Sequence, residues 1–394
     1  MRRWLLSAVL AALAASGALT APAVAQAPLP WSDDEVKAIA RHGPWPPPAP
    51  RDPSNRVAGS PNAIVLGEHL FNEPRLSADG AMSCATCHVV GRDWSDGRPK
   101  AMGRGELDRR TPSLWNVGYA HWFGWDGAGD SLWSQSIRPI LDSREMAGDA
   151  ARVAGLLRED KALACGYERA FGHKAGTDDE KLLVDSAKAL AAFQATLVSP
   201  RTPFDAFRDG LLSGDREAAA RYPAAAQRGL KIFIEANCAA CHFGPRFTNG
   251  EFGDVGIPFF TRPGEVDTGR LDGLAKLANS TFNLLGRHND DASGASALRT
   301  RHVQRLHSNF GEFRVPSLRQ AGTGPYMHNG HLATLEDVVK HYSEVNPDRL
   351  HSDAIPLVRP LALTPEESAD LVAFLRSLSA EAPPRPAPPA LCPA

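Results

Sequence analysis

Cys84-Ala85-Thr86-Cys87-His88 and Cys238-Ala239-Ala240-Cys241-His242 are two copies of one pattern, Cys-x-x-Cys-His, in a chain of 394 residues. This pattern is typical of c-type haem attachment, in which both thiols bond covalently to one porphyrin and the histidine ligates the iron. Zinc is a weaker interpretation, because a histidine directly after the second cysteine is awkwardly placed as a third ligand. A thioredoxin-type redox pair would need a βαβ context, which the sequence lacks. We therefore expect two covalently bound haems.

Each motif belongs to a longer repeated unit. Arg110-Thr-Pro-Ser-Leu follows the first motif and Arg314-Val-Pro-Ser-Leu the second, and Gly127 and Gly330 come at similar distances behind them. Two diverged copies predict two domains, as does a prior of roughly 150 residues per domain. We assign two cytochrome c-like haem domains, residues 61–212 and 213–380, with a Pro-rich lead-in at 26–60 and a loose Pro-rich tail at 381–394.

The hydrophobic pattern favours helices. Apolar residues recur at helical spacing in 63–71, 182–197 and 230–234. Thr364-Pro365-Glu366-Glu367 combines an N-cap, a first-turn proline and a capping-box glutamate, and it predicts the start of a late helix. Alternating strand patterns are scarce. The expected fold is mainly α, with long loops between the helices.

The N-terminus resembles an export signal rather than part of the fold. A basic start at 1–3, an apolar run at 4–19 and a small-residue site at 23–25 are typical of a cleaved signal peptide, residues 1–25. No later apolar run is long enough to span a bilayer. We therefore expect a periplasmic protein without a membrane span after cleavage. Its net charge of −2 gives no reason to expect a nucleic-acid partner.

Cys165 and Cys392 lack the haem spacing. The sequence leaves open whether they are separate buried thiols or form a disulfide in an oxidising compartment.

Beyond the haem motifs, the sequence resembles the bacterial di-haem cytochrome c peroxidases, a family that includes the methylamine-utilisation (MauG-type) enzymes. The resemblance runs from about Leu66 to Leu378. It is carried by Leu70-Phe-Asn-Glu-Pro-Arg-Leu-Ser, Phe123-Gly-Trp-Asp-Gly, Arg144-Glu-Met, Asp267-Thr-Gly-Arg and, most specifically, Phe313-Arg-Val-Pro-Ser-Leu-Arg through Pro325-Tyr-Met-His-Asn-Gly.

The resemblance implies a role for each motif. The first haem would react with peroxide, and the second would be the electron-entry or charge-storing haem. Glu145 matches the distal acid–base, Gln135 a distal hydrogen-bonding residue, and Trp125 the tryptophan between the haems. From the residues alone, a surface charge for Glu145 and core packing for Trp125 are the simpler interpretations.

The sequence departs from the family at the first haem. Peroxidases of the family carry a switchable histidine ligand where this chain has Arg104, and no histidine occurs between 89 and 120. His88 would then be the only protein ligand of the first iron, which would leave one position open. Arg104 would lie near the pocket or at the surface. Arg110 replaces an asparagine that helps to bind calcium in the peroxidases, so calcium is doubtful.

The second haem shows another departure. Gly324 stands where the peroxidases have a methionine ligand, which leaves the neighbouring Met327 as the expected distal ligand and Tyr326 as the alternative. A methionine ligand would raise the reduction potential, whereas a tyrosinate would favour oxidised states. His328 and His331 are candidates of lower rank.

These features predict an exported di-haem peroxidase that reduces hydrogen peroxide to water at the N-terminal haem. Electrons would arrive through the C-terminal haem from a small cytochrome c or cupredoxin. The alternative is a MauG-type oxidase, which would use peroxide-derived high-valent iron to oxidise side chains of a partner protein. A non-enzymatic electron-transfer cytochrome is the third interpretation. Glu145, Gln135 and the missing distal histidine argue against it.

Overall fold

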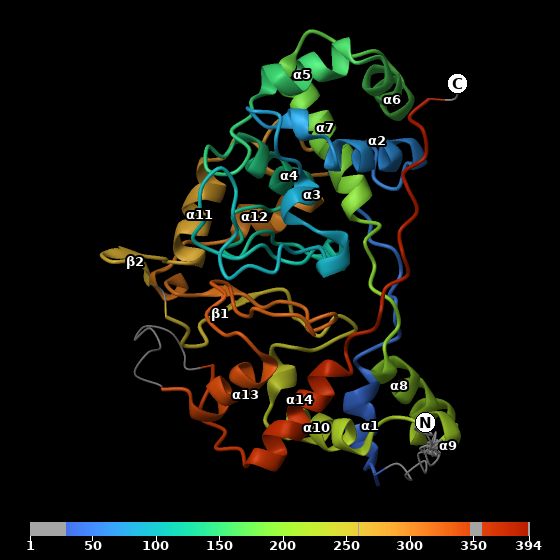
Figure 1. Ribbon diagram of the computed structural model, residues 1–394, viewed down its shortest axis with the longest axis vertical. Helices are drawn as coiled ribbons and strands as arrows, with labels where there is room; N and C mark the ends of the chain where they lie inside the picture. The colour runs from blue at the N-terminus through green and yellow to red at the C-terminus, as the bar shows by residue number, and fades with distance from the viewer. Residues whose placement is uncertain (1–28, 259, 347–356, 393–394) are drawn as a thin grey trace, which may run out of the picture.

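The computed structural model describes residues 29–258, 260–346 and 357–392, which fold mainly into helices joined by long loops (Figure 1). The expected mainly α fold is thereby confirmed. The expected signal peptide at 1–25 lies outside the described residues. None of the described helices is long and apolar enough to cross a membrane.

Two hydrophobic cores divide the helices into two units. The first unit contains α2 (Pro61–Phe71), α3 (Cys84–Cys87), α4 (Leu132–Leu141), α5 (Ala150–Glu159), α6 (Lys161–Phe171) and α7 (Asp179–Gln194). The second contains α1 (Asp33–Ala40), α8 (Pro203–Ser213), α9 (Arg216–Ala220), α10 (Ala224–Glu235), α13 (Leu335–Glu344) and α14 (Pro365–Arg376). Figure 1 shows the first unit above the second.

One helix crossing recurs in both units. In the first unit, α2 packs on α7 where a Cβ on Gly67 would overlap the carbonyl of Ala189. In the second unit, α10 packs on α14 where a Cβ on Gly229 would overlap the carbonyl of Asp370. Both glycine-bearing helices lead into a Cys-x-x-Cys-His motif. The repeat seen in the sequence therefore corresponds to a repeated helix pair.

The segment between the units belongs to the second repeat but packs on the first unit. It contains α11 (Arg270–Asn279), α12 (Leu298–His302) and two short antiparallel sheets, β1 (Phe252–Gly253) with β4 (Phe313–Arg314) and β2 (Phe260–Arg262) with β3 (Glu265–Val266). Leu284 from this segment joins the first core, and its backbone N–H donates to Asp130 at 2.8 Å. The longer second repeat thus helps to enclose the first motif.

Two observations bear on the organisation expected from the sequence. The Pro-rich lead-in contains a helix, α1, because Ser32 and Glu35 form a capping box that starts it. Phe204 and Phe207 of α8 pack in the second core, although α8 falls in the expected domain 61–212. If the domains are divided by hydrophobic core, the boundary between them lies before α8. The boundaries at 61–212 and 213–380 stay a prediction.

The tail is not loose over the residues that the structure describes. It leaves α14 and runs back along the first unit to α6 (Figure 1). Arg385 donates to Glu68 at 2.7 Å, and His69 contacts the carbonyl of Pro389 at 2.8 Å. Cys392 forms a disulfide with Cys165 on α6, with 6.3 Å between the Cα atoms. We call residues 381–392 the C-terminal strap.

Removal of this disulfide by the double substitution Cys165→Ser and Cys392→Ser should lower the free energy of unfolding by about 2–4 kcal/mol, because the closed loop is long. Denaturant unfolding of the haem-loaded protein would measure the loss. The wild-type protein with its disulfide reduced is the control and should unfold at the same midpoint as the variant. An unchanged midpoint in both samples would contradict the prediction.

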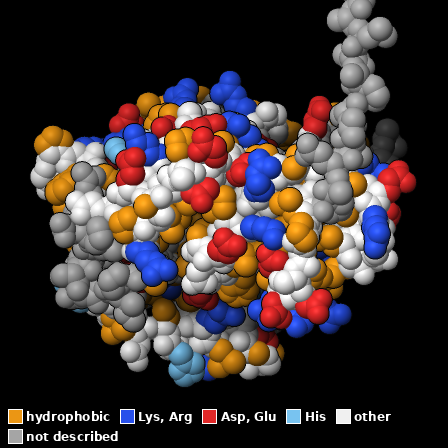
Figure 2. Space-filling view, turned by 90° about the horizontal axis from the view of Figure 1, so that it is seen from below, with side chains coloured by type: hydrophobic (Ala, Val, Ile, Leu, Met, Phe, Trp, Pro, Cys, Tyr) orange, Lys and Arg blue, Asp and Glu red, His pale blue; other side chains and the backbone are white. Residues whose placement is uncertain are grey.

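The end of the molecule seen from below carries basic, acidic and hydrophobic side chains interspersed (Figure 2). No field of a single sign covers the part of this face that the structure describes.

Candidate functional site

The first motif forms the short helix α3, and its histidine is held in one orientation. The backbone N–H of His88 donates to the carbonyl of Cys84 at 2.9 Å, and the ring Nδ1 lies 2.9 Å from the carbonyl of Trp94. This contact fixes the ring and leaves Nε2 available as a metal ligand. Both thiols of the motif are free. Burial lowers the pKa of His88, which favours the neutral, ligating imidazole.

The second motif repeats this geometry. The backbone N–H of His242 donates to the carbonyl of Cys238 at 2.9 Å, and its Nδ1 lies 3.0 Å from the carbonyl of Phe247. Cys238 and Cys241 are also free thiols. A local disulfide occupies neither motif, and each histidine presents its second ring nitrogen. Both motifs therefore fit covalent haem attachment.

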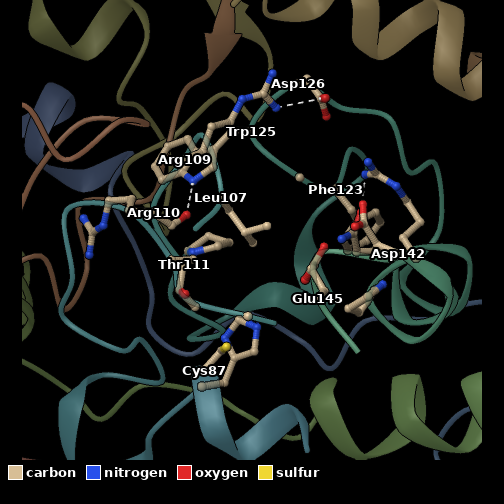
Figure 3. Close-up of a pocket in the computed structure, with 18 of the residues that line it drawn as sticks. Cys87, Leu107, Arg109, Arg110, Thr111, Phe123, Trp125, Asp126, Asp142 and Glu145 are labelled. Carbon is tan, nitrogen blue, oxygen red and sulfur yellow. Dashed lines mark hydrogen bonds and ion pairs between the residues drawn. The ribbon is translucent and has the colours of Figure 1, made fainter. Parts of the chain in front are cut away.

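A cavity of about 670 Å³ adjoins the first motif. Cys84, Cys87 and His88 line one part of it, and Glu145 and Trp125 line others. Its volume falls in the range of roughly 300–1,000 Å³ found for ligand and cofactor sites. Figure 3 shows Cys87, Trp125 and Glu145 around one open space. The cavity thus brings Cys84 together with Glu145, which lies 61 positions later in the sequence.

Glu145 lies in the loop after α4, and its carboxyl group points into this cavity (Figure 3). Burial, with a smaller contribution from the nearby Asp142, raises the pKa of Glu145 to about 7. A carboxyl group with a pKa near neutrality can both accept and return a proton. The surface-charge interpretation of Glu145 therefore does not describe its environment.

Gln135 comes from α4 and lines the same cavity. Its Oε1 accepts a hydrogen bond from Arg138 at 3.1 Å. This bond orients the amide, so that its NH₂ group remains as a donor. The three catalytic residues predicted from the sequence therefore line one cavity: Gln135, Glu145 and Trp125.

Trp125 is fixed by hydrogen bonds from both repeats. Its indole N–H donates to the carbonyl of Arg110 at 3.0 Å, and its own carbonyl accepts from the backbone N–H of Arg314 at 2.9 Å. Arg110 follows the first motif and Arg314 the second. The ring is 8% exposed and borders the cavity. Trp125 therefore lies where the two repeats meet.

Arg104 and Arg110 differ in their surroundings. Arg104 is exposed and pairs with Asp79, so it lies at the surface. Arg110 is half-buried and borders the cavity, and its Nε has no hydrogen-bond partner.

The expected distal ligands of the second haem lie in one turn. Met327 has a left-handed backbone, with φ of 63°. Burial raises the pKa of Tyr326 to about 12, against the opposing effect of the nearby Arg110. His328 stacks on Phe313 with ring centroids 3.4 Å apart, and burial lowers its pKa to about 3. His331 is exposed. The assignment of Met327 stays a prediction.

Tyr342 on α13 is a candidate site residue that no motif in the sequence indicates. Its hydroxyl lies close enough to Cys238 and Cys241 that negative charge on these thiols would add to the effect of burial, and both raise its pKa. The neighbouring His341 contacts the carbonyl of Val255 at 2.7 Å, which fixes this end of α13. Leu335, Val339 and Tyr342 follow helical spacing, so a stripe through Tyr342 was the signal in the sequence.

Two Cys-x-x-Cys-His motifs in repeated helical units, with an acid-bearing cavity beside the first, define a di-haem c-type redox protein. The family described as di-haem cytochrome c peroxidase matches residues 61–213. The chain is 34% identical to the methylamine utilization protein MauG of Methylorubrum extorquens, over 93% of this chain and 90% of the relative. It is 32% identical to the cytochrome-c peroxidase IdrP1 of Denitromonas iodatirespirans, over 87% and 89%. The chain belongs to the di-haem cytochrome c peroxidase and MauG family.

Solved structures agree with this placement. A MauG-like protein associated with microbial copper homeostasis superposes with a TM-score of 0.64 at 26% identity, over 86% of this chain and 96% of that one. The diheme peroxidase BthA of Burkholderia thailandensis superposes with a TM-score of 0.64 at 23% identity, over 84% and 89%, and supports the fold. The family membership makes the protein an oxidoreductase that uses peroxide, with two c-type haems.

Proposed function

We propose that the protein reduces hydrogen peroxide to water at the first motif, with Cys84, Cys87 and His88 holding the haem there. Cys238, Cys241 and His242 hold the second haem. A bound haem supplies a redox-active iron that takes up peroxide and exchanges electrons. His88, which lines the cavity, would be the only protein ligand of the first iron.

The position and pKa of Glu145 carry this proposal. Its carboxylate would accept a proton from hydrogen peroxide and return it to the oxygen that leaves as water, while the bound haems would supply the two electrons that break the O–O bond. The NH₂ group of Gln135 donates a hydrogen bond to the peroxide and orients it. A pKa near 7 suits both halves of this proton transfer.

Electrons reach the cavity through Trp125, whose backbone and side chain are bonded to both repeats. The donor is a small cytochrome c or a cupredoxin, and the protein is exported to the periplasm by residues 1–25. Calcium has no part in this proposal, because a cation beside the half-buried Arg110 would be repelled.

Stopped-flow addition of hydrogen peroxide to the fully oxidised protein tests the proposal. An open first iron should give a high-spin ferric signal before mixing, and the protein should react without prior reduction. Two low-spin, six-coordinate haems that do not respond to peroxide would overturn both enzymatic functions.

A second function, MauG-type oxidation of a partner protein's side chains, is favoured by Tyr342. A tyrosinate ligand on the second iron would stabilise oxidised states. In that case the product of the reaction with peroxide should persist until a partner protein is added. A requirement for half-reduction before turnover would instead favour the peroxidase.

Tyr342→Phe and Met327→Leu distinguish the two candidate ligands of the second haem. We expect Tyr342→Phe to change the electron paramagnetic resonance and near-infrared signals of one haem, because the phenolic oxygen beside Cys238 and Cys241 is lost. Met327→Leu and Tyr326→Phe should leave these signals unchanged. A change with Met327→Leu alone would restore the original prediction from the sequence.

A further inference from the structure

Three half-buried arginines between the two motifs lack an acidic partner. Arg110, Arg246 and Arg314 make no ion pair with any Asp or Glu that the structure describes. Arg109, directly beside Arg110, shows the contrast, because its guanidinium pairs with Asp126 at 2.9 Å and with Asp267 at 2.7 Å. The charge of Arg109 is thereby compensated by two direct ion pairs, whereas Arg110, Arg246 and Arg314 make none. The buried Asp96 lies near Arg110 and acts on its charge without an ion pair.

The hydrogen bonds of Arg110 and Arg314 are also incomplete. The Nε of Arg110 is buried without a partner, and its only side-chain contact is a long one of 3.5 Å to the hydroxyl of Ser95. The Nε of Arg314 donates to the carbonyl of Gly124 at 3.2 Å, which leaves its terminal nitrogens for other partners. A guanidinium group has five N–H donors in a planar fork.

Arg110 and Arg314 contact the loop that carries Trp125, and Arg246 lies close to Arg314. Arg110 and Arg314 hold Trp125 through their backbones, and both border the cavity of the first motif. Arg246 comes four residues after His242 of the second motif. Arg246 and Arg314 are close enough that the charge of Arg246 adds to the effect of burial in lowering the pKa of Arg314. Positive charge therefore accumulates between the two motifs.

Partly desolvated positive charges of this kind call for an anion. Each haem that a Cys-x-x-Cys-His motif binds brings two carboxylates, its propionate groups. Arginine suits this partner, because its fork pairs with a carboxylate through two parallel hydrogen bonds. We propose that Arg110, Arg246 and Arg314 form a carboxylate clamp that binds propionate groups of the two haems.

The clamp has an electrical consequence. Reduction removes one positive charge from an iron, so nearby guanidinium groups stabilise the reduced state. Neutral substitutions should therefore lower the reduction potential of the haem that loses its clamp. The inference rests on the two haems of the proposed function, but it does not depend on the reaction with peroxide.

Arg110→Gln, Arg246→Gln, Arg314→Gln and Arg314→Lys in the haem-loaded protein test the clamp. Resonance Raman spectra report the bending modes of the propionates, and spectroelectrochemistry reports the potentials. Each glutamine variant should shift the propionate bands. It should also lower the reduction potential of one haem by at least 59 mV, which is a tenfold change in the equilibrium constant for one-electron reduction. Arg314→Lys keeps the charge but loses the fork, so it should shift the bands and largely preserve the potential.

Arg104→Gln is the matched control, because Arg104 is exposed and paired with Asp79. It should change neither readout. Unchanged propionate bands in the glutamine variants would overturn the clamp, as would potentials that respond to added phosphate instead, since a free anion would then occupy the site. If Arg314→Gln fails to accumulate as haem-loaded protein, the propionate bands of Arg314→Lys and Arg110→Gln test the clamp instead. A protein that ignores peroxide but shows these shifts would refute the proposed function and leave the clamp standing.

Discussion

Glu145→Gln should lower the second-order rate constant for the reaction with hydrogen peroxide by about 10²- to 10⁴-fold. Glutamine keeps the size and the polar character of the side chain, but it cannot accept the proton of the peroxide. Stopped-flow mixing with the fully oxidised protein measures this rate. Glu106→Gln is a suitable control, because Glu106 is exposed and should affect the rate little. A loss below tenfold would remove Glu145 from the acid–base role.

The pH dependence gives a second reading of the same residue. Burial raises the pKa of Glu145 to about 7, so its carboxylate form is lost as the pH falls through this value. Because the carboxylate must accept the first proton, the rate constant should rise with pH through about 7 and level off above it. Glu145→Gln should lack this inflection. An unchanged profile in the variant would assign the titration to another group.

Asp205→Ala should reduce the free energy of unfolding by about 3–5 kcal/mol, because it leaves a buried arginine without its partner. Both carboxylate oxygens of Asp205 accept from Arg319, at 2.7 and 2.9 Å, and both side chains are almost fully buried. Asp205 also accepts hydrogen bonds from the backbone N–H and the hydroxyl of Thr202 at the start of α8. Denaturant unfolding followed by circular dichroism would measure the loss.

Asp209→Ala on the same helix is the control for this prediction. Asp209 pairs with Arg201 and Arg208, but it is far more exposed than Asp205. Exposed ion pairs contribute about 0–1 kcal/mol, so its removal should cost much less. Equal losses for the two variants would show that burial of the Asp205–Arg319 pair has no special effect.

The sequence was sufficient where a signal is local. The haem motifs are five residues long, and the late helix begins at Thr364 with the capping box that the sequence predicts. The capping box at Ser32 is equally local, although many prolines follow the helix that it starts. Glu145 and Trp125 required the family resemblance, since a carboxylate or an indole carries no local sign of a cavity.

Tyr342 shows why the rest could not be predicted. It lies 101 positions after Cys241, and only the packing of α13 brings its hydroxyl toward the second motif. The unpaired charges of Arg110, Arg246 and Arg314 are similarly a property of tertiary structure. An arginine in a sequence does not reveal whether a carboxylate will fold against it.

The C-terminal strap also constrains how the protein matures. Cys165 and Cys392 are 227 residues apart, so their disulfide cannot form until the chain between them has been made. The thiols within each haem motif are three residues apart and meet far more readily, because short loops close at a lower entropic cost. In an oxidising compartment, a local disulfide would block haem attachment. Haem attachment in such a compartment would therefore require the local pairs to be kept reduced until they are loaded, although the distant pair must be oxidised.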